Sequence, residues 1–357
     1  MKLLKQFVLL TIFGLSASVN AQTIIVQKAD GTNPRTFTSI DAAVADADPD
    51  DYVYLERGTY DITSAWTGYD GTLNQLNHLV VEKPLHFVGN GYYYPAEATA
   101  INGTFSLRKS ASGSTITGIK FNNNVNLDSI SNVVITRCSI NENNTYLYLC
   151  GTGTGNIITE CMIFRLHGRP SITATAGSNA NTWSSYANTV ISKNIFKNND
   201  SMGYHRNLFI YNNAFVSSGN TLILSCDNIT VKNNTLTANG PSCINNNLTN
   251  SIIQNNISVY ALTQNATNTY QDNIVETTGN TFVSFNSSGT GDYHLKTTSL
   301  GVGAGSDGTD IGIYGTFSPF KENRRTAYPR VTAFNIGSET NPNGELRVNA
   351  TVEAQDY

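Results

Sequence analysis

The stretch "VISKNIF", residues 190–196, contains a short frame that the chain repeats. The frame is Ile, two variable residues, Asn or Cys, one variable residue and an apolar residue. Further copies are "VITRCSI" (134–140), "IITECMI" (157–163), "FIYNNAF" (209–215) and "TVKNNTL" (230–236), and a looser copy is "IIQNNIS" (252–258). Weaker copies lie at Ile119 and Asn273. The spacing is near twenty residues with one exception of 33, which predicts a stack of similar structural units.

The residues of each copy predict short strands rather than helices. β-Branched and aromatic residues alternate with polar ones, and Asn and Gly separate the copies. One such unit cannot bury its apolar face alone, but stacked units about 4.8 Å apart can cover one another. We therefore expect an all-β fold, a single-stranded right-handed parallel β-helix solenoid. Two rows of side chains should face its core: Ile135, Ile158, Ile191 and Ile210; and Ile140, Ile163, Phe196, Phe215 and Leu236.

The Asn of the frame has a structural role in this prediction. The chain must bend between two strands, and Asn tolerates the left-handed backbone conformation that such a bend requires. Its amide can also bond to the amide one coil away, in a ladder that satisfies buried polar groups. Cys138 and Cys161 occupy the same position as small buried thiols. Of the five cysteines, none forms a CxxC pair, so we expect no zinc site and favour free thiols over a disulfide.

The chain ends differ from the repeats. Residues 1–21 have the pattern of a secretory signal peptide: Lys2 and Lys5, an apolar run over 7–15, and a small-residue cleavage site at Val19-Asn20-Ala21. This predicts Sec-dependent export of bacterial type, to the periplasm, the outer cell surface or the medium. Residues 22–315 would form the β-helix. Residues 316–357 alternate around the turn signal "NPNG", which predicts a C-terminal β-hairpin covering the end or side of the stack.

Composition excludes some partners. Without the signal peptide, 20 basic side chains oppose 26 acidic ones, a formal charge of −6, and only 13% of the chain is charged. Without a basic patch, we expect no nucleic-acid partner. No stretch is long and apolar enough for a transmembrane segment. We expect a monomer whose partner is a polysaccharide or a cell-surface glycan.

A short helix is predicted over 38–47, with Thr38 as its N-cap and Asp41 three residues further on. It would cover the open end of the core. The stretch "FTSIDAAVADADPDDYVYLERGTYDI" (37–62), followed by "LHFVGNG" (85–91), resembles the N-terminal cap and first coils of the secreted right-handed parallel β-helix proteins of the pectin-lyase-like superfamily. The stretch "GDYHLKTTSLGVGAGSDGTDIGIYG" (291–315) resembles the closing segment of bacterial members. This resemblance implies the fold; the superfamily contains lyases, hydrolases, esterases, adhesins and members without assigned activity.

Candidate catalytic residues gather around the one long spacing. A uronate lyase needs a base for the proton beside the carboxylate and a cation to neutralise that carboxylate. "FRLHGRP" and "SMGYHRN" flank the coil of Lys193 and supply two candidate bases and three candidate cations. The intervening segment carries aromatic residues that could stack on a sugar. The candidates are Arg165, His167, Arg169, Lys193, His205 and Arg206 for catalysis, and Trp183 and Tyr186 for binding.

Other features leave the function open. In "TYLYLC", Leu147 and Leu149 should face inward, so Tyr146 and Tyr148 would face outward and could bind a glycan. The middle coils contain no close carboxylate pair, which argues against a glycoside hydrolase. We expect no metal and no cofactor, although Asp307 and Asp310 could form a calcium turn. The hypotheses are a protein that binds or acts on polysaccharide, a uronate lyase, and a structural or adhesive surface protein without turnover.

Overall fold

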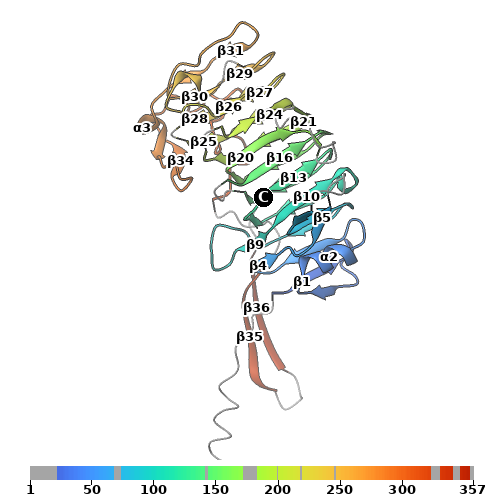
Figure 1. The fold of residues 1–357 in the computed structure, drawn as a ribbon. Coiled ribbons are helices and arrows are strands. Elements are labelled where there is room, and N and C mark those ends of the chain that lie inside the picture. The colour runs from blue at the N-terminus through green and yellow to red at the C-terminus, as the bar shows by residue number, and fades with distance from the viewer. Residues whose placement is uncertain are drawn as a thin grey trace, which may run out of the picture.

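The computed structural model describes residues 22–67, 74–140, 144–171, 183–198, 200–217, 219–244 and 247–322, together with the backbone of 330–340 and 346–353. The predicted signal peptide lies outside them. Three sheets of mostly parallel strands wind into one long stack, from the N-terminal cap at one end to β31 at the other (Figure 1). Each full coil adds one strand to each sheet, as β10, β11 and β12 illustrate. The chain is therefore a parallel β-helix, as the repeats predict.

Sheet 1 includes the antiparallel strands of the cap. Its order is β2 (Arg35–Phe37), β1 (Ile24–Gln27), β3 (Tyr52–Leu55), β8 (His86–Val88), β11 (Thr115–Thr117), β14 (Val134–Thr136), β18 (Ile157–Thr159), β21 (Ser184–Ser192), β24 (His205–Tyr211), β27 (Thr230–Lys232), β29 (Ile252–Gln254) and β31 (Thr269–Gln271), with β17 (Thr152–Thr154) beside β21.

Sheets 2 and 3 complete the coils. The order in sheet 2 is β7 (His78–Val81), β10 (Thr104–Arg108), β13 (Val125–Asp128), β16 (Tyr146–Cys150), β20 (Arg165–Arg169), β23 (Met202–Gly203) and β26 (Ile223–Leu224). The order in sheet 3 is β4 (Gly58–Asp61), β9 (Thr99–Asn102), β12 (Lys120–Phe121), β15 (Ser139–Ile140), β19 (Met162–Ile163), β22 (Ile195–Phe196), β25 (Ala214–Phe215), β28 (Thr235–Leu236), β30 (Ile257–Ser258) and β32 (Ile274–Val275).

The two predicted inward rows are confirmed. Ile135, Ile158, Ile191 and Ile210 are paired in register from strand to strand and are fully buried. The second row, which runs from Ile140 to Leu236 along sheet 3, is buried as well. Burial of side chains of this size is worth about 1.5–3 kcal/mol each, so the repeated rows provide much of the stability of the stack.

The predicted amide ladder also forms. The backbone N–H of Asn213 donates to Oδ1 of Asn234 at 2.8 Å, and its Nδ2 reaches the same oxygen at 3.0 Å. The same Nδ2 donates to the carbonyl of Ile191 in the preceding coil at 2.8 Å. Equivalent bonds join the rest of the ladder. Its members are Cys138, Cys161, Asn194, Asn213, Asn234, Asn256 and Asn273. Each amide thereby connects neighbouring coils inside the corner between sheets 1 and 3.

The structure corrects the position of the left-handed residue. The positive φ angles belong to the residue before each ladder position, as at Lys193 (54°), Asn212 (53°) and Asn233 (58°). The reason is that two consecutive residues of the corner have different roles. One residue turns the backbone with its side chain outward, and the next directs its side chain into the stack to make the ladder bonds. Asn213 therefore acts through its hydrogen bonds and not through a left-handed backbone.

The N-terminal cap agrees with the prediction except at its first residue. The helix α2 spans Ile40–Asp46, and Ile40, Ala43 and Val44 are buried in the core. The N-cap is Ser39, whose hydroxyl accepts from the N–H of Ala42 at 3.4 Å, and not Thr38. Asp41 does not close a capping box; its carboxylate accepts from Thr63 and Ser64. All five cysteines are buried and free.

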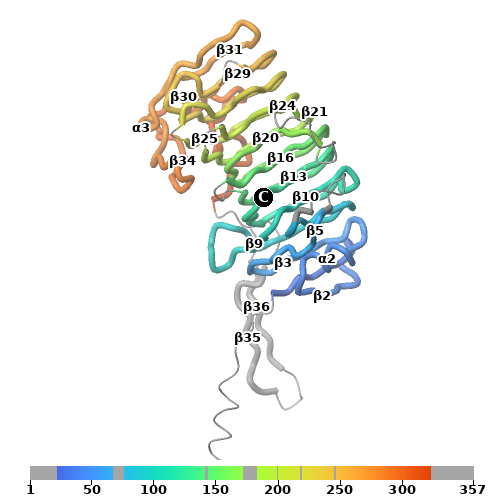
Figure 2. The backbone as a smooth tube through the Cα atoms, viewed as in Figure 1, coloured from blue at the N-terminus to red at the C-terminus, as the bar shows by residue number. Residues whose placement is uncertain are grey.

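A closing segment, residues 276–320, runs along the outside of sheet 3. It contains α3 (Thr278–Thr281), β33 (Phe282–Ser284) and β34 (Asp292–Leu295), which lie beside β25 and β30 in Figure 2. The aromatic residues Phe282, Tyr293 and Phe320 form a second core with the outward-facing Ile195 and Ala214. The closing segment therefore covers the outer face of sheet 3 over these coils, and the apolar side chains of both are buried.

The left-handed residues of the corner hold the closing segment in place. Lys193 donates to the carbonyl of Ser318 at 2.9 Å, and Asn212 donates to the carbonyl of Gly312 at 3.2 Å. Two coils beyond Asn212, Asn255 donates to the carbonyl of Ala304 at 3.1 Å. The tail forms the predicted antiparallel hairpin from β35 (Arg330–Thr340) and β36 (Leu346–Glu353). Its predicted packing against the stack concerns side chains outside the described residues.

Replacing Asn213 by Leu should lower the free energy of unfolding by about 1–3 kcal/mol, because buried donors and acceptors of two coils lose their partners. Asn228→Gly is the matched control, since Asn228 is exposed and has a φ of 51° that Gly adopts freely. Chemical denaturation of both variants measures the difference. Equal losses in the two variants would contradict the role of the ladder.

Candidate functional site

The outer face of sheet 2 brings together half of the predicted site residues. Leu147 and Leu149 are buried in the core, so alternation directs Tyr146 and Tyr148 of β16 outward. On the next strand, β20, the same alternation directs Arg165, His167 and Arg169 outward. The register pairs Tyr146 with Arg165 and Tyr148 with His167. The three outward residues of "FRLHGRP" therefore lie beside the two outward tyrosines of "TYLYLC", on the neighbouring strand.

Close contacts order this group. The rings of Tyr146 and Tyr148 stack at 4.8 Å between centroids, and the guanidinium of Arg169 lies 3.7 Å above the Tyr148 ring. The guanidinium of Arg165 lies 5.3 Å from the Tyr146 ring and donates to its hydroxyl. Cation–π contacts of this kind hold the two arginines over the sheet. Tyr148 is consequently almost fully buried, and burial raises the pKa of its hydroxyl to about 12. It serves as a support for Arg169 and presents little ring surface to a ligand.

His167 lies between the two arginines. Its Nε2 is 2.9 Å from the carbonyl oxygen of Asp200, and because a carbonyl only accepts, Nε2 carries the proton and Nδ1 retains a lone pair. Burial, with a smaller contribution from Arg165 and Arg169, lowers the pKa of His167 below its ordinary value. The ring is therefore neutral at pH 7 and has a free basic nitrogen.

Two predicted residues are inside the protein instead of on its surface. His205 is fully buried on β24, with Nδ1 2.9 Å from the Ser184 hydroxyl and Nε2 3.2 Å from the Leu166 carbonyl. Tyr186 is fully buried and donates to the carbonyl of Leu127 at 2.6 Å. The strand β21 begins at Ser184, so Tyr186 belongs to sheet 1 and not to a surface loop. His205, in the neighbouring strand β24, pairs with Ser184 and is buried beside it. Neither side chain can reach a polysaccharide in this structure.

The remaining candidates lie at two other places. Lys193 is at the corner between sheets 1 and 3, 4.0 Å from the Glu160 carboxylate and bonded to the closing segment. Its role is structural in this arrangement. Arg206 is exposed, lies 4.5 Å from the Trp183 ring and is 3.5 Å from the Asp227 carboxylate. This pair belongs to the corner between sheets 2 and 1, on the side of sheet 2 where β20 ends.

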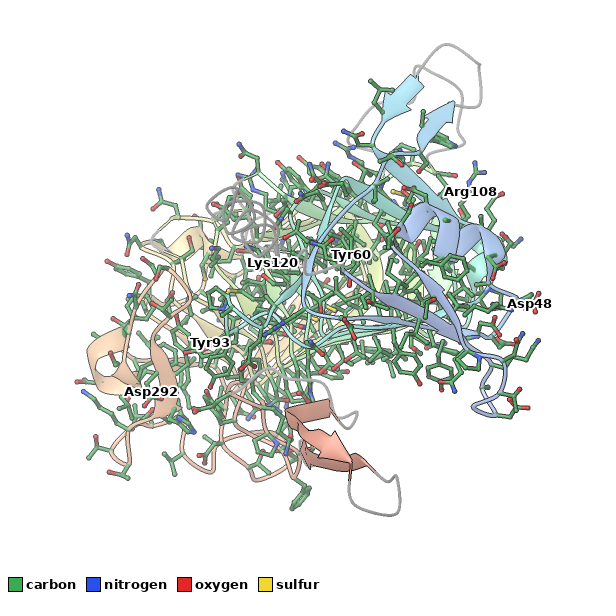
Figure 3. All side chains as sticks on the ribbon, turned by 90° about the horizontal axis from the view of Figure 1, so that it is seen from below. Asp48, Tyr60, Tyr93, Arg108, Lys120 and Asp292 are labelled. Atoms are coloured by element: carbon green, nitrogen blue, oxygen red, sulfur yellow. The ribbon has the colours of Figure 1, made fainter. Side chains whose placement is uncertain are left out.

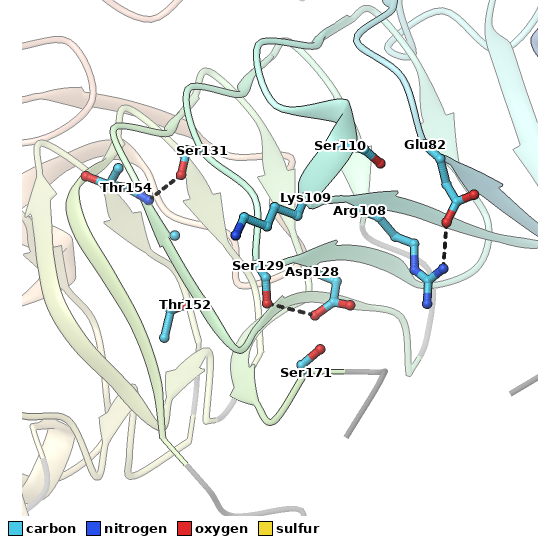
Figure 4. A pocket seen from close by; sticks show the side chains of 11 residues that line it. Glu82, Arg108, Lys109, Ser110, Asp128, Ser129, Ser131, Thr152, Thr154 and Ser171 are labelled. Carbon is cyan, nitrogen blue, oxygen red and sulfur yellow. Dashed lines mark hydrogen bonds and ion pairs between the residues drawn. The ribbon is translucent and has the colours of Figure 1, made fainter. Parts of the chain in front are cut away.

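A groove next to the arginines was not predicted. It has a volume of about 1170 Å³ and follows the ends of β10, β13 and β16 (Figure 4). Arg108, Asp128, Cys150 and Arg169 share one register row, so the groove continues the line of Arg169 along the stack. Arg108 pairs with Glu82 at 2.6 Å. The sequence contains a signal for this row, but its parts are about twenty residues apart. Each of the four residues directly follows an inward-facing position, which is Leu in three coils and Gly168 in the fourth. The polar and charged lining residues are Glu82, Arg108, Lys109, Ser110, Asp128, Ser129, Ser131, Thr152, Thr154 and Ser171.

A row of buried, hydrogen-bonded polar side chains lies at the N-terminal end of the outer face of sheet 2. Nε2 of His78 is 2.7 Å from the Ser106 hydroxyl, which accepts from Nδ2 of Asn126 at 2.8 Å. Trp66 covers His78 at 5.2 Å between ring centroids, from the small hairpin of β5 (Ala65–Thr67) and β6 (Asn74–Leu76). Burial lowers the pKa of His78 to about 4, so this ring is neutral. Ser106 is fully enclosed and acts as part of the support of the face.

Acidic residues lie close together at two places in and next to the closing segment. Asp307 accepts from the N–H and hydroxyl of Thr309, and Asp310 accepts from the N–H of Gly303, so both carboxylates already stabilise turns. Asp292, His294 and Glu322 offer ligand atoms within 4.8 Å of one another, but all three are exposed. Figure 3 shows Asp292 on the side of the molecule opposite Arg108 of sheet 2. Among the described residues, no helix is long and apolar enough to cross a membrane.

Comparisons with known proteins add little to this geometry. No protein-family model matches the chain, and no curated protein matches it. Among solved structures, the chain is similar to the protein ORF18 of Geobacillus virus E2, with 13% sequence identity and a TM-score of 0.36 over 87% of this chain and 83% of that one. The function is therefore argued from the chemistry of the faces themselves.

The buried His205 predicts a stability that falls with acid. Burial lowers the pKa of His205 to about 3, whereas an unfolded histidine has a pKa near 6.5. The unfolded chain therefore binds this proton first, so the stabilisation is complete above about pH 6.5 and is lost progressively below it. We expect His205 alone to cost about 1–2 kcal/mol between pH 7 and pH 5. Denaturation at both pH values should show this difference reduced in His205→Gln and retained in the surface variant His294→Gln; an unchanged difference in His205→Gln would contradict it.

Proposed function

We propose that this chain is an exported protein of the pectin-lyase-like kind that binds an acidic polysaccharide along the outer face of sheet 2. The observation that carries this proposal is the row of Arg165, His167 and Arg169, two guanidinium groups fixed over stacked tyrosines on one rigid strand. Guanidinium groups pair with carboxylates through two parallel hydrogen bonds. A chain of uronate sugars presents such carboxylates at regular intervals.

The geometry favours charge over ring stacking as the source of affinity. Arg169 is exposed, and it covers the Tyr148 ring that would otherwise meet a sugar. Arg108 and Lys109 of the adjoining groove extend the row of cations, although Glu82 pairs with Arg108 and Asp128 lies in the same row. The proposed ligand therefore runs along the stack, across successive coils. As a monomer exported by its signal peptide, the protein would meet this ligand at the cell surface or outside the cell.

A uronate lyase is the second candidate, and His167 is the observation that favours it. A neutral imidazole with a free Nδ1, placed between two cations, has the composition of a proton-abstracting site. In that reaction Nδ1 takes the proton beside the uronate carboxylate. The electrons of that C–H bond form a carbon–carbon double bond. The glycosidic carbon–oxygen bond on the neighbouring carbon breaks, and its oxygen leaves with the bonding electron pair and takes up a proton from water. Arg165 and Arg169 would stabilise the negative charge that develops on the carboxylate.

Binding of the mature chain to polygalacturonate and alginate tests the proposal. Arg169→Ala should weaken binding about tenfold, equivalent to about 1.4 kcal/mol, and should reduce its salt dependence. Arg57→Ala is the matched control, because it removes one exposed charge near the start of β4 in sheet 3. Affinity electrophoresis at two salt concentrations gives both quantities.

Equal weakening by Arg57→Ala and Arg169→Ala would mean that the affinity follows net charge and that sheet 2 is not the site. Ultraviolet absorption of the same mixtures detects unsaturated sugar ends. Their appearance, and their loss in His167→Ala with binding retained, would establish the lyase. Binding without product would leave a polysaccharide-binding or adhesive protein.

A further inference from the structure

The outer face of sheet 1 differs from both other faces. In the described residues, the central outward positions of five consecutive strands, β11 to β24, carry no charged side chain. The first charged residue beyond them is Lys232 on β27. The closing segment packs along sheet 3 and therefore does not cover this face in the part of the chain that the structure describes. Ten residues occupy these central outward positions: Thr115, Thr117, Val134, Thr136, Ile157, Thr159, Val190, Ser192, Phe209 and Tyr211.

These residues form two regular rows. The register aligns Val134, Ile157 and Val190 in an aliphatic row, and Ile157 is 41% exposed. Beside it, Thr136, Thr159 and Ser192 form a row of hydroxyl groups. Neighbouring members of each row are about 4.8 Å apart, the spacing of strands in a sheet. A flat surface with alternating methyl and hydroxyl rows results.

Aromatic side chains mark both ends of the rows. Tyr52 and Tyr54 of β3 stack at 5.8 Å, and Tyr52 contacts His86 of β8 at 4.7 Å between ring centroids. At the other end, Phe209 and Tyr211 of β24 lie 5.7 Å apart. Burial lowers the pKa of His86, so the first cluster is neutral at pH 7. Six strand spacings separate β3 from β24 in the sheet order, or about 29 Å.

We propose that this face binds a neutral polysaccharide lying along the axis of the stack. Aromatic rings pack against the C–H faces of pyranose sugars, and the hydroxyl row between the two clusters can exchange hydrogen bonds with sugar hydroxyls. Charge complementarity selects a neutral ligand. Among the described residues, the central outward positions from β3 to β24 carry no cation that could compensate the charge of an acidic glycan, a nucleic acid or an anionic membrane, and Arg206 lies at the far end of β24, at the corner with sheet 2. This site is separate from the arginine row of sheet 2 and does not depend on it.

Two faces with opposite preferences would let one rod connect two glycans. An acidic polymer on sheet 2 and a neutral polymer on sheet 1 could be bound at the same time, because the two sheets face different directions around the coil (Figure 1). Affinity at sheet 2 should fall with salt, whereas affinity at sheet 1 should not. This difference separates the two sites experimentally.

The test measures retention of the mature chain on microcrystalline cellulose, chitin and mannan at low salt and at about 0.5 M salt, where exposed charges are screened. We expect retention on at least one of these neutral glycans at both salt concentrations. Thr159→Glu places a carboxylate in the middle of the face and should reduce retention at least fivefold. Thr59→Glu is the matched control, because Thr59 is exposed on β4 of sheet 3. Tyr211→Ser, a milder change, decides the question if Thr159→Glu fails to fold by circular dichroism.

Failure of the wild-type chain to bind any of the three neutral glycans would overturn the proposal. Equal loss in Thr159→Glu and Thr59→Glu would do so as well, since the face would then have no special role. Arg169→Ala should leave retention on neutral glycans unchanged. Loss of acidic-polysaccharide binding in that variant concerns sheet 2 alone, so either proposal can fail without the other.

Discussion

The interaction on which the structure depends is the hydrogen bond from the backbone N–H of one corner residue to the side chain of the corresponding residue in the next coil. From Cys161 to Asn273 these bonds recur at 2.8 to 3.1 Å. A corner between two strands exposes backbone groups that the sheets cannot satisfy, and inside a stack no water replaces the missing partner. The Asn side-chain amide both donates and accepts, so a repeated Asn can satisfy the backbone N–H and C=O groups at the corner of every coil. The ladder also fixes register, because a slip of one residue would place every Asn against a strand.

Register turns a repeated sequence into three different surfaces. The outward positions of sheet 2 collect arginines, tyrosines and His167 in rows, and those of sheet 1 collect aliphatic and hydroxyl side chains. Outward positions of sheet 3 become apolar at Ile195 and Ala214, and the closing segment covers them. The left-handed residues of the corner then anchor that segment through Lys193, Asn212 and Asn255. The corner that holds the coils together therefore also fixes the closing segment on sheet 3, and in the described residues this segment does not cover sheets 1 and 2.

The sequence was sufficient for the parts of the structure that repeat. The frame around "VISKNIF" predicted both inward rows and the ladder, because these depend on spacing alone, and the alternation in "TYLYLC" predicted the outward tyrosines. It misplaced the left-handed residue by one position, since Asn occupies both places at 212–213 and 233–234 and composition cannot separate them. Tyr186 was assigned to an insertion because the spacing of 33 hides the extent of β21, which begins at Ser184. His205 was assigned to a catalytic site because the sequence does not show that β24 pairs with β21 from Ser184 onward. The groove and the neutral face escaped prediction because their residues are one coil apart and become neighbours only through the register.

Native-state hydrogen exchange of the ladder amides tests the central claim most directly. If the ladder holds the stack, the N–H groups of Asn194, Asn213 and Asn234 should exchange only through global unfolding, with the same free energy as the buried strand amides of Ile191 and Ile210. Denaturant should change all of these rates in parallel. Exchange of the ladder amides at the rate of exposed surface turns, while the strand amides stay protected, would contradict the account.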